Sequence, residues 1–97
     1  MSNVQAVMLM CFRISKLVDE NKATMGQIAM TKAYVSERLR EIAKWGREIM
    51  GGNGILHDNY LMKAVADAEA IYTYEGTFDV NTLVAGRDLT GIAAFKK

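Results

Sequence analysis

The sequence of 97 residues contains no proline and only one cysteine, Cys11. A single cysteine excludes an internal disulfide and fits a reducing compartment. No apolar run approaches the roughly 18 residues of a membrane-spanning helix, and no cleavable signal is visible. We therefore expect a soluble, intracellular chain with no membrane insertion.

The sequence also has no large excess of charge of either sign, since it contains 12 Lys and Arg residues and 11 Asp and Glu residues. This balance, with no basic run, argues against nucleic acid or an anionic membrane surface as the main partner. The only histidine, His57, has no second histidine or cysteine nearby, so we expect a surface turn there and no metal site. The length allows one domain, residues 1–97, with a modest core.

The absence of proline and the abundance of Met, Ala, Leu and Lys favour helices throughout. Residues 3–19 carry apolar side chains at helical spacing and on a second face as well, including Met10 and Phe12. This pattern predicts a helix buried between other helices or subunits. Cys11 lies among these apolar residues, so we expect it to pack in the core.

Residues 24–50 form the longest predicted helix, about 40 Å at 1.5 Å per residue, with Thr24 as a candidate N-cap. Its seven-residue repeat, which predicts the seam of a helical bundle, consists of Ile28, Val35, Ile42 and Ile49, with Met25, Leu39 and Ala43 widening the stripe. The opposite side is charged and predicts a solvated or interface face. Trp45 lies off the seam, where a subunit contact is favoured over a wall near a cofactor.

Two further helices complete the prediction. The third spans about residues 60–70 and is capped by Asp58 or Asn59. Residues 70–74 are β-branched and aromatic, which predicts an extended connection. The fourth helix begins near Gly76 or Thr77 and ends near Gly91, and a short tail docks through Phe95. The sequence thus predicts an all-α, antiparallel bundle of about four helices.

Two motifs carry the possible chemistry. The first is Met50-Gly51-Gly52-Asn53-Gly54-Ile55, whose glycines permit positive φ and close approach of another group. The second is Thr73-Tyr74-Glu75-Gly76-Thr77, in which Glu75 is the only carboxylate of an apolar and aromatic run. A backbone cradle with an isolated carboxylate indicates a cofactor and a base. Each motif also has a plainer interpretation, as a helix C-cap and a solvated glutamate.

Together with Gly86-Arg87 and Thr90-Gly91-Ile92, these motifs make residues 43–95 resemble the C-terminal end of the acyl-CoA dehydrogenases, flavoenzymes that desaturate acyl thioesters. The chain is most similar to the branch with glutaryl-CoA dehydrogenases and short-chain peroxisomal acyl-CoA oxidases. The resemblance implies the C-terminal helical domain of that fold, without the N-terminal helical and middle β domains. We therefore expect a fragment that is inactive alone.

The resemblance implies that Glu75 is the base that removes the α-proton of an acyl-CoA, while the β-hydrogen leaves as hydride to FAD. Apolar neighbours such as Ile71 would desolvate the carboxylate, and the backbone amide of Glu75 would help to bind the thioester oxygen. Gly76 and Tyr74 would contact the substrate.

FAD contacts are implied for Thr77 and Asp79, whereas no role is implied for Phe78. The first motif would reach the adenine and pyrophosphate end of FAD bound mainly by a neighbouring subunit, through Glu48, Ile49, Met50, Gly51 and Gly52. Many relatives have glutamine at the position of Glu48, and a carboxylate there cannot donate hydrogen bonds. A shared cofactor implies a homo-oligomer, a dimer or tetramer.

Several alternatives stay open at this stage. A rival interpretation is a non-catalytic helical oligomerisation module derived from the same family. For an enzyme, the motifs are common to decarboxylating and plain dehydrogenases, with electron-transfer flavoprotein as acceptor, and to oxidases, with oxygen. The compartment would be cytoplasm, mitochondrial matrix or peroxisome.

Overall fold

The computed structural model describes residues 1–95, so the last two residues of the expected tail lie outside it. Four α-helices make up the fold: α1 (Ser2–Asp19), α2 (Met25–Ile49), α3 (Leu61–Thr73) and α4 (Phe78–Thr90). Two short 3₁₀ helices, η1 (Gly51–Ile55) and η2 (His57–Asn59), join α2 to α3. No β-strand occurs within residues 1–95. The predicted all-α fold is confirmed.

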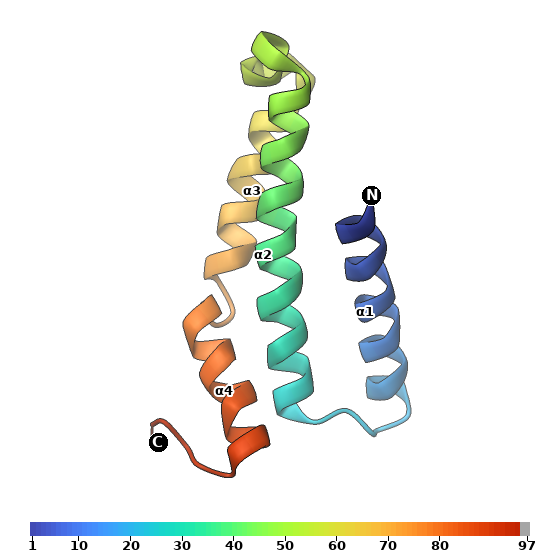
Figure 1. Ribbon diagram of the computed structural model, residues 1–97, viewed down its shortest axis with the longest axis vertical. Coiled ribbons are helices and arrows are strands. Elements are labelled where there is room, and N and C mark those ends of the chain that lie inside the picture. Colours follow the sequence, from blue (N-terminus) through green and yellow to red (C-terminus); the bar gives the residue numbers. More distant parts are fainter. Residues whose placement is uncertain (96–97) are drawn as a thin grey trace.

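The long helix α2 is the axis of the molecule (Figure 1). α1 runs antiparallel to α2 on one side, and α3 and α4 follow each other end to end along another side. The molecule is elongated, with extents of 48 × 28 × 19 Å and a radius of gyration of 15.7 Å. A compact domain of this length has a radius of gyration of about 13 Å. The arrangement is therefore an open bundle in which α2 alone touches every other helix.

The capping role predicted for Thr24 is confirmed. The Thr24 hydroxyl accepts a hydrogen bond of 3.1 Å from the Gln27 amide, and the Gln27 side chain accepts one of 3.0 Å from the Thr24 amide. This reciprocal capping box satisfies amide groups that have no partner within the helix. It explains why α2 starts at Met25.

The predicted seam of α2 is only partly buried in this chain, because Val35 and Ile42 are half-buried and Ala43 is buried, whereas other members are exposed. Ile28 is 39% exposed and Ile49 is 86% exposed. The buried residues of α2 are all small, namely Gly26, Ala29, Thr31, Ala33, Ser36 and Ala43. Thr31 faces the groove toward α1, whereas Gly26 contacts Asp88 of α4, and small side chains allow such close approach of helices. The sequence period identified the helix and part of its packed face, but not the small residues from Gly26 to Ser36 that are buried most completely.

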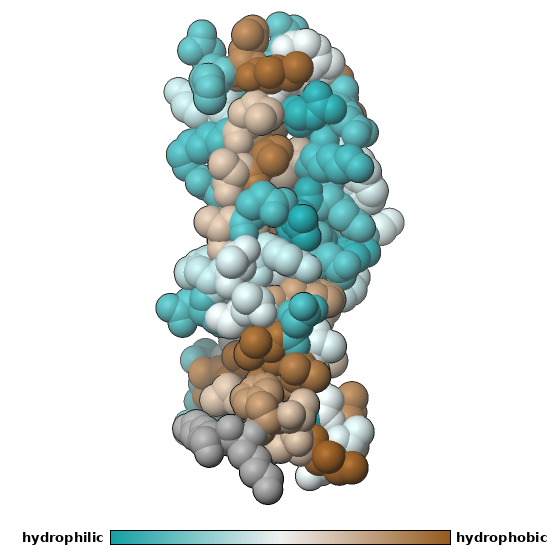
Figure 2. Space-filling view, turned by 90° about the vertical axis from the view of Figure 1, so that its left-hand side faces the viewer, coloured by the Kyte–Doolittle hydropathy of each residue, from teal (hydrophilic) through white to brown (hydrophobic). Residues whose placement is uncertain are grey.

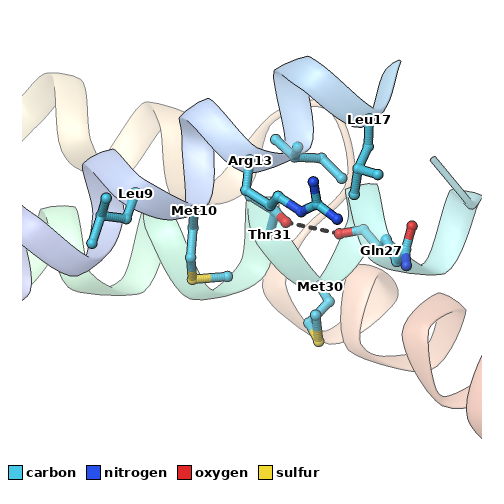
Figure 3. Close-up of a pocket in the computed structure, with 8 residues that line it drawn as sticks. Leu9, Met10, Arg13, Leu17, Gln27, Met30 and Thr31 are labelled. Atoms are coloured by element: carbon cyan, nitrogen blue, oxygen red, sulfur yellow. Dashed lines mark hydrogen bonds between the residues drawn. The ribbon is translucent and has the colours of Figure 1, made fainter. Parts of the chain in front are cut away.

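α1 buries none of its residues within this chain. The core position expected for Cys11 is wrong, because its side chain is exposed. The side chains of Met10 and Arg13 point from α1 toward α2 and line a groove together with Gln27 and Thr31 (Figure 3). The Thr31 hydroxyl donates a hydrogen bond of 2.8 Å to the Gln27 carbonyl in this groove. α1 therefore packs on α2 along one side only.

Two expectations for α3 are wrong. Neither Asp58 nor Asn59 caps it, because its N-cap is Tyr60, a left-handed residue with φ 61° and no side-chain cap. Residues 70–73 are helical rather than extended, and α3 continues to Thr73. Local β propensity is overruled here by tertiary contacts, since the Tyr72 ring stacks on Phe78 at a centroid distance of 5.6 Å.

α4 follows the prediction more closely. Thr77 is its N-cap and accepts a hydrogen bond of 3.3 Å from the Val80 amide. It ends at Gly91, whose φ of 74° suits a glycine C-cap. Phe95 lines a pocket with Met25 and Leu83, in keeping with the expected docking of the tail.

Figure 2 shows the face formed by α3 and α4. Hydrophilic residues flank α3, whereas hydrophobic residues gather over α4. No helix within residues 1–95 is both long and apolar enough to cross a membrane.

Candidate functional site

The loop between α3 and α4 displays the candidate base. Tyr74 is extended, whereas Glu75 and Gly76 both have positive φ, 56° and 94°. Thr77 then returns the chain to an extended conformation and starts α4. Glu75 is exposed at the turn, where a group from outside the chain can reach it.

Positive φ carries an energetic cost at one of these two positions. Glycine accepts it freely, but for a residue such as Glu75 the left-handed region costs roughly 1–2 kcal/mol. Such a conformation persists only where the surrounding structure holds it. Two side chains, neither of which the sequence analysis singled out, hold this turn.

The first is Asn81 on α4, a buried residue. Its side-chain amide donates hydrogen bonds of 2.7 Å to the Gly76 carbonyl and 3.2 Å to the Thr77 carbonyl. A Cβ added at Gly76 would lie only 2.9 Å from the Asn81 Nδ2 atom. Glycine is thus required at position 76 by this chain's own packing, in addition to the substrate contact that the resemblance implies.

The second is Lys32 on α2. Its ammonium group donates hydrogen bonds of 2.7 Å to the Gly76 carbonyl and 3.3 Å to the Tyr72 carbonyl. The sequence did contain a signal, because Lys32 is the only charged residue between Met25 and Ser36. A lone charge in the uncharged half of a helix indicates a specific partner.

An aromatic and charged cluster supports the loop at its base. The Tyr72 and Phe78 rings are nearly parallel, 12° apart, and join the end of α3 to the start of α4. The Arg40 guanidinium lies 4.1 Å from the Tyr72 ring centroid and bonds the Glu69 carboxylate over 2.8 Å. That hydrogen bond raises the pKa of Arg40 above its ordinary value. Phe78, to which no role was assigned, is therefore part of the loop's support.

The glycine motif forms η1 at the far end of α2. Gly51 has a φ of 56°, and no atom lies within 4 Å of a Cβ built at Gly51 or Gly52. Gly54 differs, because it is buried and a Cβ there would collide with the Arg47 carbonyl. Only the first two glycines leave free backbone for a ligand, whereas Gly54 lets η1 fold back onto α2.

The remaining predicted cofactor residues belong to these two places. Glu48, Ile49 and Met50 are exposed at the C-terminal end of α2 beside η1. Asp79 is exposed in the first turn of α4, next to the cap Thr77. Within residues 1–95 there is no cluster of three His, Cys, Asp or Glu side chains that could hold a metal ion.

The two motifs are far apart within one chain. α3, with 13 residues, separates them along the molecule and is about 20 Å long (Figure 1). Tyr74, Glu75, Gly76 and Thr77 form one site, and the segment from Glu48 to Gly52 forms another. A ligand much shorter than about 20 Å therefore cannot contact both motifs of one chain.

Comparison with known proteins identifies the family of this chain. The family model described as acyl-CoA dehydrogenase, C-terminal domain, matches residues 1–90. The chain is 30% identical over 76 residues to the mitochondrial isovaleryl-CoA dehydrogenase of Bos taurus, covering 78% of this chain and 18% of that protein. It is 28% identical over 83 residues to subunit CarC of the caffeyl-CoA reductase-Etf complex of Acetobacterium woodii, covering 86% and 22%. The chain thus spans about a fifth of the length of these relatives.

Solved structures agree with the sequence comparison. The glutaryl-CoA dehydrogenase of Mycobacterium smegmatis superposes with a TM-score of 0.87 at 29% identity, over 92% of this chain and 23% of that one. A second structure of a glutaryl-CoA dehydrogenase from this organism, in complex with FADH2, gives a TM-score of 0.85 at 30% identity, with the same coverage. The chain belongs to the acyl-CoA dehydrogenase family and has the fold of its C-terminal helical domain.

Proposed function

We propose that this chain acts as the C-terminal domain of an FAD-dependent enzyme that removes the α- and β-hydrogens of an acyl-CoA thioester. The observation that carries the proposal is the loop from Tyr74 to Thr77, which presents an exposed carboxylate on a backbone held from two helices. Family membership and the FADH2 complex of the glutaryl-CoA dehydrogenase relative support it. The N-terminal helical and middle β domains of the fold would complete the site.

Glu75 would accept the α-proton on its carboxylate, because a general base must come within hydrogen-bond reach of the proton that it removes. The Glu75 amide would donate to the thioester oxygen and stabilise the negative charge that develops there. Gly76 leaves room beside that oxygen, and Tyr74 would contact the acyl-CoA. FAD, when bound, supplies the hydride acceptor for the β-hydrogen, so that a carbon–carbon double bond forms.

The proposed FAD contacts fit the local geometry at both ends. Gly51 and Gly52 have open space at their Cα atoms, so a phosphate group can approach their backbone. Thr77 and Asp79 lie at the N-terminal end of α4, where the free amides and the helix dipole favour polar and anionic groups. Glu48, Ile49 and Met50 would flank the adenine end.

A homo-oligomer is part of the proposal. The chain exposes 7198 Å², whereas a compact monomer of its mass exposes about 5,500 Å². Exposed apolar side chains on α1 supply much of the excess, with Leu9 61% and Phe12 68% exposed. Since about 20 Å separates the two motifs in one chain, a dimer or tetramer would let one FAD contact Glu75's loop in one subunit and η1 in another.

The exposed face of α1 also favours the second candidate, a helical oligomerisation module without catalysis. The electron acceptor in the enzymatic case would be electron-transfer flavoprotein or oxygen. The name of the Acetobacterium relative, a caffeyl-CoA reductase-Etf complex subunit, is in keeping with the former.

Replacing Glu75 by Gln in the full-length enzyme that carries this chain tests the catalytic proposal. We expect flavin absorbance to be retained and turnover to fall by at least about 10³-fold, because the amide cannot accept the proton. Asp58→Asn is the matched control, an exposed carboxylate outside the site, and should leave turnover unchanged. Turnover that survives Glu75→Gln would refute the role of Glu75.

The chain on its own separates the two candidates further. After incubation with FAD and removal of free cofactor, its visible spectrum and molar mass are measured on one sample. Flavin retained in an oligomer would support the proposed shared site. An oligomer without flavin, together with an inactive full-length enzyme, would support the assembly module.

A further inference from the structure

Lys32 lies on α2, 43 residues before Glu75, yet its ammonium group reaches the loop that carries Glu75. Its partners are both backbone carbonyls, those of Tyr72 and Gly76, at 3.3 Å and 2.7 Å. The Tyr72 carbonyl is in the last turn of α3, where carbonyl groups have no partner within the helix. The Gly76 carbonyl follows directly after the two residues with positive φ.

These two bonds link fixed points on either side of Glu75. A cation at the C-terminal end of a helix is also favourable to the helix dipole, which holds the ammonium group in place. Asn81 bonds the same Gly76 carbonyl from the opposite helix, over 2.7 Å. The Gly76 carbonyl is therefore held by donors from both α2 and α4, so the Gly76–Thr77 peptide plane, one residue after Glu75, has little freedom to rotate.

We propose that Lys32 is a positioning residue for Glu75, holding the Glu75–Gly76 turn so that the carboxylate and the Glu75 amide face the acyl-CoA in fixed directions. This inference rests on the proposed function, because it assigns Lys32 a part in the same reaction. Lys32 bonds two backbone carbonyls, lies 5.8 Å from the centroid of the Tyr74 ring, and takes no proton in the reaction. Its effect on rate comes from geometry, since a displacement of about 1 Å at a reacting group can cost 10²-fold.

Lys32→Met removes the donor and keeps the apolar stem of the side chain, and Lys32→Arg keeps a charged donor. Lys44→Met is the matched control, an exposed lysine on the same helix. In the full-length enzyme we expect Lys32→Met to lower kcat by about 10- to 100-fold, with flavin absorbance retained and KM for the acyl-CoA within about twofold. Lys32→Arg should stay within about threefold of the parent kcat, and Lys44→Met should equal it.

A kcat for Lys32→Met within about twofold of the parent would overturn the proposal. If Lys32→Met fails to fold, Lys32→Gln is compared with Lys32→Arg in the same way. Equal kcat values for Lys32→Gln and Lys32→Arg would overturn the proposal. A purely structural lysine predicts a lower melting temperature with kcat of the folded fraction unchanged, so the kcat measurement separates the two roles.

Glu75→Gln is measured in parallel, so that failure of the proposed function is recognised separately. An inactive Glu75→Gln enzyme beside a fully active Lys32→Met enzyme refutes the role of Lys32 alone, whereas an active Glu75→Gln enzyme refutes the proposed function. Amide hydrogen exchange of Tyr74 and Val80, whose amides bond the Ala70 carbonyl and the Thr77 hydroxyl on either side of Glu75, gives a readout independent of turnover. We expect exchange at least about tenfold faster in Lys32→Met and unchanged in Lys44→Met.

Discussion

One carboxylate oxygen of Asp88, near the end of α4, accepts a hydrogen bond of 2.9 Å from the backbone amide of Gly26 at the start of α2. The amide belongs to the first turn of the helix, where it has no intrahelical partner, and an anion is favoured there. A residue of α4 thus caps the N-terminal end of α2 across 62 positions of the sequence. The contact fixes α4, and with it the loop of Glu75, against α2.

Gly26→Ala should destabilise the chain by about 1–3 kcal/mol, although alanine is the better helix former. A Cβ at Gly26 would collide with the Asp88 carboxylate and with its Cβ, so rotation of the Asp88 side chain cannot relieve the clash. The control is Gly46→Ala on the same helix, where the nearest atom lies at 3.6 Å. We expect it to be neutral or stabilising by up to about 1 kcal/mol. Urea unfolding measures both, and equal effects would contradict the prediction.

Gly54→Ala and Gly52→Ala should separate folding from cofactor binding in the glycine motif. A Cβ at Gly54 would meet the Arg47 carbonyl, so we expect a loss of about 1–3 kcal/mol. Gly52 has open space around it, and its substitution should change stability by less than about 0.5 kcal/mol while weakening FAD binding. Thermal unfolding and flavin retention are compared in the two variants. A Gly52→Ala enzyme with undiminished FAD affinity would remove this glycine from the proposed cofactor site.

Glu75→Gly should raise stability while it removes activity. Glycine relieves the cost of a φ of 56°, a gain of up to about 1 kcal/mol after its greater freedom in the unfolded chain is counted. Glu75→Ala, which keeps a Cβ, serves as control and should give no such gain. The melting temperatures of the two variants test this prediction. A melting temperature of Glu75→Gly below that of the parent chain would show that the glutamate side chain itself stabilises the turn.

Asn81→Ala should cost about 1–3 kcal/mol, because it removes a buried donor that satisfies two backbone carbonyls. Thr82→Ala, at the next and exposed position, should cost less than about 0.5 kcal/mol. Urea unfolding compares the two variants. A small effect for Asn81→Ala would mean that water replaces its side chain in the loop.

Glu69→Gln should cost less than about 1 kcal/mol, because both partners of its ion pair with Arg40 are well exposed and screened by solvent. The hydrogen bond to Glu69 raises the pKa of Arg40, so the stability linked to Arg40 ionisation is fully present below its ordinary pKa and is lost only in strongly alkaline solution. This contribution should not differ between about pH 6 and pH 9. Urea unfolding at both values, with Asp67→Asn of the exposed Lys63 pair as control, checks the prediction.

The local signals of the sequence were reliable where the chain itself supplies the partner. The Thr24 capping box joins residues three apart, and the glycine cap at Gly91 closes the helix that precedes it. The family motifs around Glu75 likewise identified the family by residue type and spacing alone. Their roles in binding and catalysis remain predictions.

The packed faces of the helices and the side chains that hold the Glu75 loop could not be predicted, because both depend on residues distant in the sequence. Isoleucine spacing on α2 predicted a seam, but small residues such as Ala29 and Ala33 allow the closest approach to another helix. Aromatic and β-branched residues before Tyr74 predicted an extended segment, but stacking of Tyr72 on Phe78 stabilises a helix. Lys32 and Asn81 converge on Gly76 from separate helices, a convergence that no spacing reveals.

The sequence by itself determined the existence of four helices, the caps at Thr24 and Gly91 and the identity of the two motifs, since these depend on short-range periodicity, capping chemistry and residue type. Only the tertiary structure decided which faces pack, that about 20 Å separates the two motifs, and that Glu75 sits on a turn of positive φ. The physical reason is that an unfavourable backbone conformation is stable only when distant groups bond to it. Those groups come together once the helices have packed.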